Sequence, residues 1–261
     1  MFPRFSVTRF SFALGALAAL LISLPAHAAD IVYSGGGALS QIVDGGGTHT
    51  IFTLINLDSS AAPYTLYFYD DNGNPLPLST TTTTTTSSPA GAPSTSVTGT
   101  LPPLGSVIFT TDGSSPIVVE GWAFLVTDNT IAGSAVFGIP LNSLYVEASC
   151  PLDTGANMQF GLPFDSTTAV TGIAIANSWM SSTPLTIGVT VYDINGNQLL
   201  TDTVTLPGNG HTSFLLTTRY PQLATQQGFV IFTGSYYMTV LGLRATATTF
   251  TSVTPIVASG W

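Results

Sequence analysis

Short segments in which apolar and polar residues alternate follow one another along this chain. In the segment 186–192, Ile187, Val189 and Val191 fall on one face of an extended backbone and the threonines fall on the other. Such segments are rich in Val, Ile, Thr, Phe and Tyr, and clusters of Gly, Pro, Asn and Asp separate them. The pattern predicts an all-β protein with strands of about six residues.

The predicted strands form two sets along the chain. The stretches 117–119 and 229–232 are apolar on both faces, which is typical of strands at the centre of a sandwich or against a neighbouring unit. In chain order, the predicted strands cover residues 50–57, 64–69, 106–111, 117–127, 131–139 and 144–148, then 171–177, 185–192, 203–206, 212–217, 229–233 and 237–245.

The second half of the chain repeats landmarks of the first half in the same order. The motif YDDNGN at 69–74 returns as YDINGN at 192–197, displaced by 123 positions. After this motif the displacement drops to 105, because a Ser/Thr/Pro tract at about 79–98 lies in the first copy only. We therefore predict an internal duplication with one insertion. The other matching pairs are Asp44 and Asp165, Asn56 and Asn177, 100–105 and 205–210, and 121–122 and 228–229.

These repeats predict two tandem Ig-like antiparallel β-sandwich modules. Module 1 is expected to comprise residues 29–150 and module 2 residues 151–261, and each is long enough to bury its own core. The Ser/Thr/Pro insertion at about 79–98 is expected to be a solvated loop, because it has little apolar surface to bury. O-glycosylation or a contact surface is the functional alternative for this low-complexity tract.

The first 28 residues have the pattern of a secretory signal peptide. Arg4 and Arg9 precede an apolar run at 12–24, and Ala26-His27-Ala28 supplies small residues at a cleavage site. We expect cleavage after Ala28 and export to the extracellular space, the cell surface or the periplasm. A membrane anchor is the alternative, but the apolar run is shorter than the roughly 20 residues of a spanning helix, so we expect no membrane span after cleavage.

The composition excludes nucleic acid as a partner. Without residues 1–28, the chain has two arginines, no lysine and all 13 acidic residues, so its formal net charge is −11. Neutralisation of phosphates requires many Lys and Arg side chains. Charged residues make up 7% of the chain, so Thr, Ser, Asn and Gly must supply most of the surface exposed to water.

Cys150 is the only cysteine, so the chain cannot form an internal disulfide. We expect a small buried apolar side chain at this position. An unpaired cysteine in an exported protein could instead be a reactive thiol or could link two chains, and the sequence leaves this alternative open.

The Tyr-Asp motifs are predicted to be turns before they are anything else. Each contains an Asn-Gly pair, which favours a type I′ hairpin turn with positive φ at both residues. A calcium loop is a weak alternative, because the spacing of the oxygen ligands does not fit an EF-type loop and Ile194 replaces Asp71 in the second copy. The weak calcium candidates are Asp70, Asp71, Asn72 and Asn74.

Polar residues that recur in both halves are expected to be structural. A side chain that caps a turn has the same task in each copy, whereas a catalytic residue would recur only if both copies were active. We therefore assign structural roles to the repeated landmarks Asp44, Asn56, Asp70, Gly73, Asp165, Asn177, Asp193 and Gly196.

No catalytic motif and no cofactor-binding motif is present, so we expect neither enzymatic activity nor a cofactor. There is no nucleophile elbow, zinc-binding HExxH or P-loop in the sequence. A catalytic triad would have to recruit His49 or His211, and Asp202 upstream of His211 is too generic a partner. Glu120 and Glu147 are the only glutamates, and the sequence does not place them together.

Aromatic residues are the remaining functional candidates. Trp179 follows a predicted strand, and its counterpart in the first copy is Asp58, so the shared fold does not require this tryptophan. Packing against the sister module is the favoured interpretation of Trp179, and stacking on a sugar or docking of a partner is the alternative. Tyr236 and Tyr237 are further ligand-binding candidates, while Trp122, which matches Phe229, is expected in the core.

Several strings together resemble an uncharacterised family of exported bacterial proteins with paired β-sandwich modules. The resemblance covers the chain after residue 28 and implies the fold, but no activity and no catalytic residues. The insertion at about 79–98 departs from the family pattern. The matching strings are DGGGTHTIFTLIN at 44–56, FYDDNGN at 68–74, GWAFLV at 121–126, AGSAVFGI at 132–139, FGLPFD at 160–165, GIAIAN at 172–177 and LGLRA at 241–245.

The sequence thus favours an exported, non-enzymatic protein with an adhesion-like binding or structural role at the cell surface or outside the cell. Its partner is expected to be a glycan or an extracellular protein, and the oligomeric state is left open. A polysaccharide-acting hydrolase with a cleft between the modules is the alternative. A less favoured one is an outer-membrane β-barrel, because Pro255 and Ser259 interrupt the terminal segment.

Overall fold

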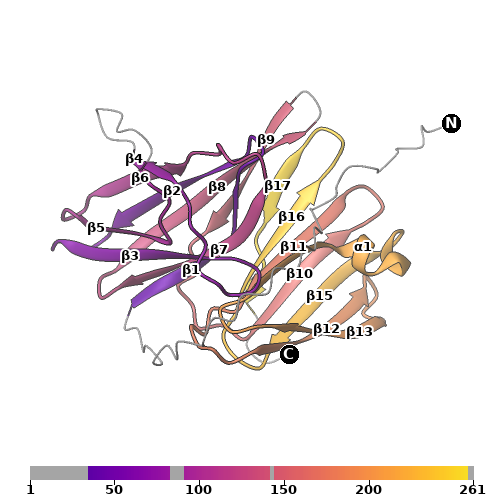
Figure 1. Ribbon diagram of the computed structural model, residues 1–261. Helices are drawn as coiled ribbons and strands as arrows, with labels where there is room; N and C mark the ends of the chain where they lie inside the picture. The colour runs from indigo at the N-terminus through magenta and orange to yellow at the C-terminus, as the bar shows by residue number, and fades with distance from the viewer. Residues whose placement is uncertain (1–34, 83–90, 142–143, 258–261) are drawn as a thin grey trace, which may run out of the picture.

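The computed structural model describes residues 35–82, 91–141 and 144–257. The predicted signal peptide at 1–28 lies outside the described residues, as does Trp261. Within the described part, no helix has the length and apolar character to cross a membrane. Nearly all regular secondary structure of the described chain is β-strand, which confirms the predicted all-β class (Figure 1).

The first half of the chain forms two antiparallel sheets, and we keep the name module 1 for its strands β1–β9. One sheet has the order β1 (Gly35–Asp44), β7 (Val119–Thr127), β3 (Ala62–Tyr69), β5 (Ser96–Leu101). The other has the order β4 (Thr80–Thr82), β6 (Ser106–Thr111), β2 (His49–Asn56), β8 (Ile131–Leu141), β9 (Leu144–Pro151).

The second half, module 2, comprises β10–β18 and also forms two antiparallel sheets. One has the order β13 (Gln198–Leu206), β12 (Leu185–Asp193), β15 (Gln227–Gly234), β10 (Gln159–Asp165), β18 (Ile256–Val257). The other has the order β14 (His211–Leu215), β11 (Val170–Ala176), β16 (Thr239–Ala245), β17 (Phe250–Val253). Helix α1 (Leu216–Arg219) and the 3₁₀ turn η1 (Pro221–Leu223) follow β14.

The strand orders of the two modules correspond. The order β1-β7-β3-β5 matches β10-β15-β12-β13, and β6-β2-β8-β9 matches β14-β11-β16-β17. Only β4 and β18, each at a sheet edge, have no counterpart among the described strands. The two halves therefore share one strand order, while the internal duplication itself stays a prediction.

Each module buries an apolar core between its two sheets, because alternate residues of each strand point inward. In module 1 the largest core side chains include Phe52, Phe68 and Phe109, with the rings of Phe52 and Phe109 stacked at 4.9 Å. In module 2 the core includes Ile187, Val189 and Val191, as the alternation predicts.

The sheet with β11 and β16 lies between the core of module 2 and module 1. Ile173 and Ile175 on β11 face the module 2 core, whereas Ala174 packs with the core residues of module 1. Ala176 joins a separate buried cluster with Trp122 of module 1. In Figure 1, β17 lies beside β9, and β11 and β16 both contact β1, so this sheet of module 2 packs on module 1.

Several predicted elements differ from the structure. Strands β1, β4, β5, β10, β17 and β18 were not predicted. Strand β1 begins with three glycines and contains a bulge, and β10 contains Pro163. The predicted strand 212–217 ends at Leu215, where α1 begins. The loop expected at about 79–98 is wrong at both ends, since Thr80–Thr82 form the edge strand β4 and β5 begins at Ser96. Residues 83–90 of this tract lie outside the described residues.

The predicted type I′ turn at each Asn-Gly pair is wrong. Gly73 has a φ of 79°, but Asn72 is not in the left-handed region. The N–H of Gly73 donates to the carbonyl of Asp70 at 3.0 Å, and the N–H of Asp70 donates to the carbonyl of Asn74 at 2.9 Å. This is a longer hairpin turn in which a right-handed segment is followed by a left-handed glycine. The second motif has the same bonds, with Gly196 at a φ of 81°.

Candidate functional site

Three aromatic side chains that the sequence singled out meet at one end of module 2. The ring of Trp179 stacks on Tyr236, with centroids 5.5 Å apart and planes at 18°. Tyr237 meets Trp179 edge-on at 5.0 Å. Trp179 is 40% exposed and Tyr236 is 38% exposed. We call these three residues the aromatic cluster, and it presents two large, partly exposed rings beside each other.

The loop after β11 holds Trp179 in place through a buried asparagine. The Nδ2 of Asn177 donates to the carbonyls of Thr183 and Pro207, at 3.1 and 3.0 Å. Its Oδ1 accepts a 3.4 Å hydrogen bond from the main-chain N–H of Trp179. Because Asn177 is fully buried, these bonds fix the loop to the strand end below it. These hydrogen bonds therefore fix the backbone conformation at Trp179.

Met180, the next residue, fastens the loop on its other side. It has a φ of 54° and packs against the buried cluster that contains Trp122 and Phe124 of module 1. The ring contacts of Trp179 described above lie within module 2, whereas Met180 packs on residues of module 1. Packing of Trp179 against module 1, the favoured interpretation from the sequence, stays a prediction.

The corresponding end of module 1 has polar residues instead of this cluster. By the repeat displacements, Trp179, Tyr236 and Tyr237 correspond to Asp58, Asn129 and Thr130. The Oδ2 of Asp58 accepts hydrogen bonds from the Nδ2 of Asn129 at 3.2 Å and from the N–H of Thr130 at 2.8 Å. These bonds lower the pKa of Asp58. The same place in the fold thus holds a hydrogen-bonded group in one module and an aromatic cluster in the other.

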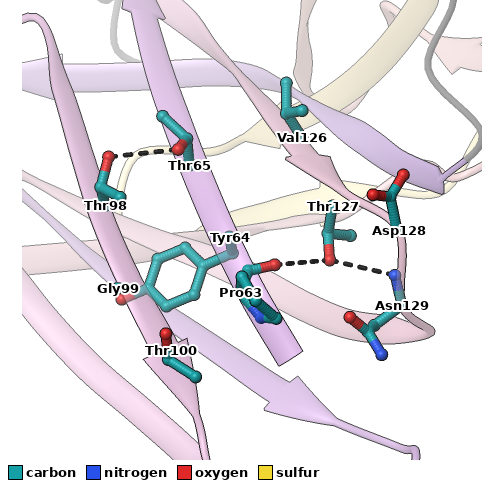
Figure 2. A pocket seen from close by; sticks show the side chains of 10 residues that line it. All are labelled: Pro63, Tyr64, Thr65, Thr98, Gly99, Thr100, Val126, Thr127, Asp128 and Asn129. Carbon is teal, nitrogen blue, oxygen red and sulfur yellow. Dashed lines mark hydrogen bonds between the residues drawn. The ribbon is translucent and has the colours of Figure 1, made fainter. Parts of the chain in front are cut away.

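A shallow groove of about 400 Å³ lies beside that polar group in module 1 (Figure 2). The ring of Tyr64 lies across Gly99, where a side chain would collide with it. Burial of Tyr64 raises the pKa of its hydroxyl. The rest of the lining is mostly hydroxyl and amide groups, and it comprises Pro63, Thr65, Thr98, Thr100, Val126, Thr127, Asp128 and Asn129.

A second polar group crosses the boundary between the modules. The Nδ1 of His211 lies 2.7 Å from the Oδ1 of Asp71, and its Nε2 lies 3.1 Å from the Oε1 of Gln41. The hydroxyl of Ser213 donates to the Oε2 of Glu120 at 2.6 Å. His211 and Ser213 belong to module 2 and the other three belong to module 1. We call these five residues the interface network.

The interface network has the geometry of a structural contact. Both ring nitrogens of His211 already have partners, and Ser213 is bonded to a carboxylate rather than to the histidine. Burial raises the pKa of Glu120 and the carboxylate of Asp71 adds to this, while the Ser213 bond and His211 lower it. A hydrolase would need free carboxylates about 5–10 Å apart across a cleft. Here Asp71 and Glu120 are both hydrogen-bonded to module 2.

The sequence missed the carboxylate partner of His211. The hydroxyl of Tyr220 and the guanidinium of Arg219 both donate to Asp202, at 2.8 and 2.9 Å, which lowers the pKa of that carboxyl. The histidine pairs instead with Asp71, 140 positions away. Only the replacement of Asp71 by Ile194 in the second motif signalled that Asp71 had a task beyond the turn.

The weak calcium candidates are occupied by the turn itself. The Oδ1 of Asp70 accepts the N–H groups of Asn72 and Asn74, and its Oδ2 accepts the Nδ2 of Asn74. Asp193 makes the same three bonds in the second motif, and they lower its pKa. Among the described residues, no group of three or more His, Cys, Asp or Glu side chains could hold a metal ion. The geometry is that of a turn.

The repeated asparagines and aspartates hold loops. Asn56 donates to the carbonyls of Ser60 and Pro102, as Asn177 does in its own loop. Asp44 accepts the N–H of Gly113 at 3.0 Å. Asp165 accepts hydrogen bonds from both Thr167 and Thr168, which lower its pKa. The two aspartates thus fix different neighbours, although both act locally on loops.

Two expectations about buried residues are confirmed. Trp122 is fully buried as predicted, but it lies in the cluster between the modules, whereas its counterpart Phe229 is only partly buried. Cys150 is fully buried and its Sγ lies 3.5 Å from the hydroxyl of Ser40. A thiol in this position cannot reach another chain while the module is folded.

No protein-family model matches the sequence, and no curated protein matches it significantly. The resemblance to a family of exported bacterial proteins therefore stays a prediction, and any function must be argued from the residues.

Proposed function

We propose that this chain is an exported, non-enzymatic binding protein that holds a neutral glycan at the aromatic cluster of module 2. The observation that carries the proposal is that Trp179, Tyr236 and Tyr237 come from two loops and meet at the surface. The C–H faces of sugar rings pack on aromatic rings, and the exposed edges of Trp and Tyr can make hydrogen bonds. An adhesion-like role at the cell surface or outside the cell follows.

The location of the aromatic cluster supports a role in binding rather than in stability. Module 1 keeps the same loops without aromatic residues, so stability of this fold does not require three rings there. Large partly exposed aromatic residues cost solubility and are typical of binding sites. The loops at the end of a sandwich are also where such folds commonly place ligands.

Charge favours a neutral ligand. The chain without residues 1–28 has a formal charge of −11, which repels polyanions over the range of a Debye length. The three members of the aromatic cluster are uncharged, and the serine and threonine hydroxyls nearby can exchange hydrogen bonds with a polyol. The hydroxyl of Ser235, next to Tyr236, already accepts such a bond from the N–H of Thr186 at 3.1 Å.

The proposal is tested by glycan binding of the chain that starts at residue 29. Arrays of neutral and acidic glycans identify a ligand, and calorimetry then measures its affinity. We expect Trp179→Ala to weaken binding by about tenfold or more, because a stacked ring of this kind dominates small interfaces. Asp58→Ala, at the equivalent place in module 1, is the matched control and should leave affinity unchanged.

Three outcomes would reject the glycan assignment. They are the absence of binding to any neutral glycan, unchanged affinity in Trp179→Ala, and specific binding to an extracellular protein without glycan binding. Thermal unfolding of each variant shows that the fold is retained, which is expected since Trp179 lies at the surface.

A further inference from the structure

The contact between the modules joins two different surfaces of one fold. Module 1 contributes Asp71, Glu120 and Trp122, and we call this surface the front face. Module 2 contributes Asn209, His211 and Ser213, and we call this surface the back face. Because the modules correspond strand by strand, module 1 also has a back face and module 2 also has a front face. Neither is used in the contact between the modules.

The unused back face of module 1 is apolar and exposed. Leu104 and Ile108 stand where module 2 has Asn209 and Ser213, and they are 71% and 41% exposed. Ile55 pairs with Ser106 on the neighbouring strand and is 39% exposed, and Leu57 beyond it is 53% exposed. Four apolar side chains thus gather on two adjacent strands and their loops. A cluster of this kind marks an interaction surface in a soluble protein.

Leu104 also has a strained backbone. Its φ is 55°, the same value as that of Asn209 in module 2. Asparagine tolerates this left-handed conformation, whereas leucine does so rarely. The leucine is highly exposed, so packing within module 1 does not explain it. Strain at an exposed apolar residue points to a role for its side chain in binding.

The unused front face of module 2 has also lost the charged residues that form the contact between the modules. Ile194 replaces Asp71 and is 70% exposed, and Phe229 replaces Trp122 and stacks on Tyr192 at 5.1 Å. Gln227 replaces Glu120, so both carboxylates of the interface network are lost on this face. The turn at Gly196 has no neighbour where the turn at Gly73 meets module 2.

We propose that two copies of this chain bind head to tail, with the front face of module 2 of one copy on the back face of module 1 of the next. Each of the two unused faces lacks the polar groups that would pair with those missing from the other. The front face lacks the two carboxylates, and the back face lacks their partners, since Ser106 replaces His211 and Ile108 replaces Ser213. A carboxylate at position 194 would have no cation opposite it, whereas Ile194 would meet apolar side chains.

The contact between copies is expected to be smaller than the contact between modules. On β11, Gly172, Ala174 and Ala176 present small side chains to module 1, while the corresponding residues of module 1 include Ile51 and Ile55. These larger side chains keep the strands apart, so the copies meet at the turns around Leu104 and Ile194. An interface that joins two different surfaces leaves one of each free and can extend into a chain or close into a ring.

Sedimentation velocity over a concentration series of the chain that starts at residue 29 tests the proposal. We expect reversible association of the unaltered chain. Leu104→Asn and Ile194→Asp each install the residue of the sister module, so the fold accepts them, and each should weaken association about tenfold or more. Ile117→Asp is the matched control, because Ile117 is 67% exposed on a loop outside both faces.

A mixing experiment separates this contact from other forms of association. Ser106→His places a histidine on the back face, where it can pair with Ile194→Asp on the front face of another copy. The two variants mixed should associate more tightly than Ile194→Asp alone, and more weakly as the pH rises above the pKa of histidine. A monomer at all concentrations, or association that Leu104→Asn and Ile194→Asp leave unchanged, would overturn the proposal.

Discussion

The indole N–H of Trp122 donates a 2.7 Å hydrogen bond to the main-chain carbonyl of Asn209, across the boundary between the modules. The main-chain N–H of His211, two residues on, donates to the carbonyl of Asp71 at 3.1 Å. One turn of module 2 is therefore bonded to two separate segments of module 1. This contact fixes the orientation of the modules more closely than apolar packing alone, because hydrogen bonds have direction.

Replacement of Trp122 by phenylalanine, the residue at the equivalent position of module 2, should loosen this contact. Trp122→Phe removes the indole N–H that donates to the Asn209 carbonyl, and it leaves space in a buried cluster. We expect a loss of about 1–3 kcal/mol in the free energy of unfolding. Urea denaturation measures it. The reverse change, Phe229→Trp, lies outside the module contact, and an equal loss there would contradict the explanation.

The two Tyr-Asp turns permit a matched test of local and interface effects. Gly196→Ala should cost about 1–2 kcal/mol, because φ is 81° and nothing stands near the new Cβ. Gly73→Ala has the same backbone penalty, and its Cβ would also overlap the carbonyl oxygen of Gly208 in module 2. Thermal unfolding should show a clearly larger loss for Gly73→Ala. Equal losses of stability for the two variants would mean that the turn at Gly73 does not pack against module 2.

The sequence predicted best those features of the fold that depend on residues close together in the chain. Asp70 and Asp193 hold their turns through bonds to residues two and four positions away, so a short motif contains the whole arrangement. The alternation in β12 likewise identified its buried face. Strand β1 escaped prediction because its glycines and its bulge interrupt the pattern, and only its pairing with β7 makes it a strand.

In the candidate sites, too, the sequence predicted individual residues but not the contacts between distant segments. Comparison of the two halves of the sequence identified Trp179 as a residue that the shared pattern does not need. Tyr236 and Tyr237 were candidates only because they are aromatic. Their stacking depends on how two loops 57 positions apart meet, and no local pattern contains that. The pairing of Asp71 with His211 depends on the packing of two modules, and it is therefore beyond any analysis of single segments.

Asp165 should stabilise module 2 at neutral pH. The hydroxyls of Thr167 and Thr168 donate to its carboxylate at 2.6 and 2.7 Å and lower its pKa below the ordinary value of 3.8. A lowered pKa means that the stabilisation is present above pH 4 and is lost as the pH falls through the folded-state pKa. Asp165→Ala should therefore melt at a lower temperature at pH 7, with a smaller difference below pH 3. An unchanged melting temperature at pH 7 would contradict the structural role.

Cys150 should be inert while module 1 is folded. Its side chain is fully buried, and burial raises the pKa of the thiol, so little thiolate forms and reagents cannot reach it. A thiol reagent at pH 8 should react with the chain only after unfolding in guanidinium, and then with one equivalent. Rapid reaction of the native chain, or a disulfide-linked dimer on a non-reducing gel, would show that the thiol is accessible.

Glu120 should make the interface between the modules sensitive to pH in the opposite sense to Asp165. Burial raises the pKa of this carboxyl, so the folded state holds the proton more tightly than the unfolded state does. Its contribution to stability is therefore complete below the unfolded pKa of about 4.3 and is lost as the pH rises through the folded-state pKa. Glu120→Gln keeps the shape, removes the charge and can still accept the Ser213 hydrogen bond.

We expect Glu120→Gln to gain stability relative to the unaltered chain as the pH rises from 4 to 7, measured as melting temperature against pH. Other charges bear on this carboxyl, since Asp71 raises its pKa and His211 lowers it. His211→Asn is therefore measured in parallel. Without the histidine, the advantage of glutamine over glutamate at pH 7 should grow, because the carboxylate loses its favourable neighbour. Parallel pH profiles for Glu120→Gln and the unaltered chain would show that Glu120 does not titrate between folded and unfolded states.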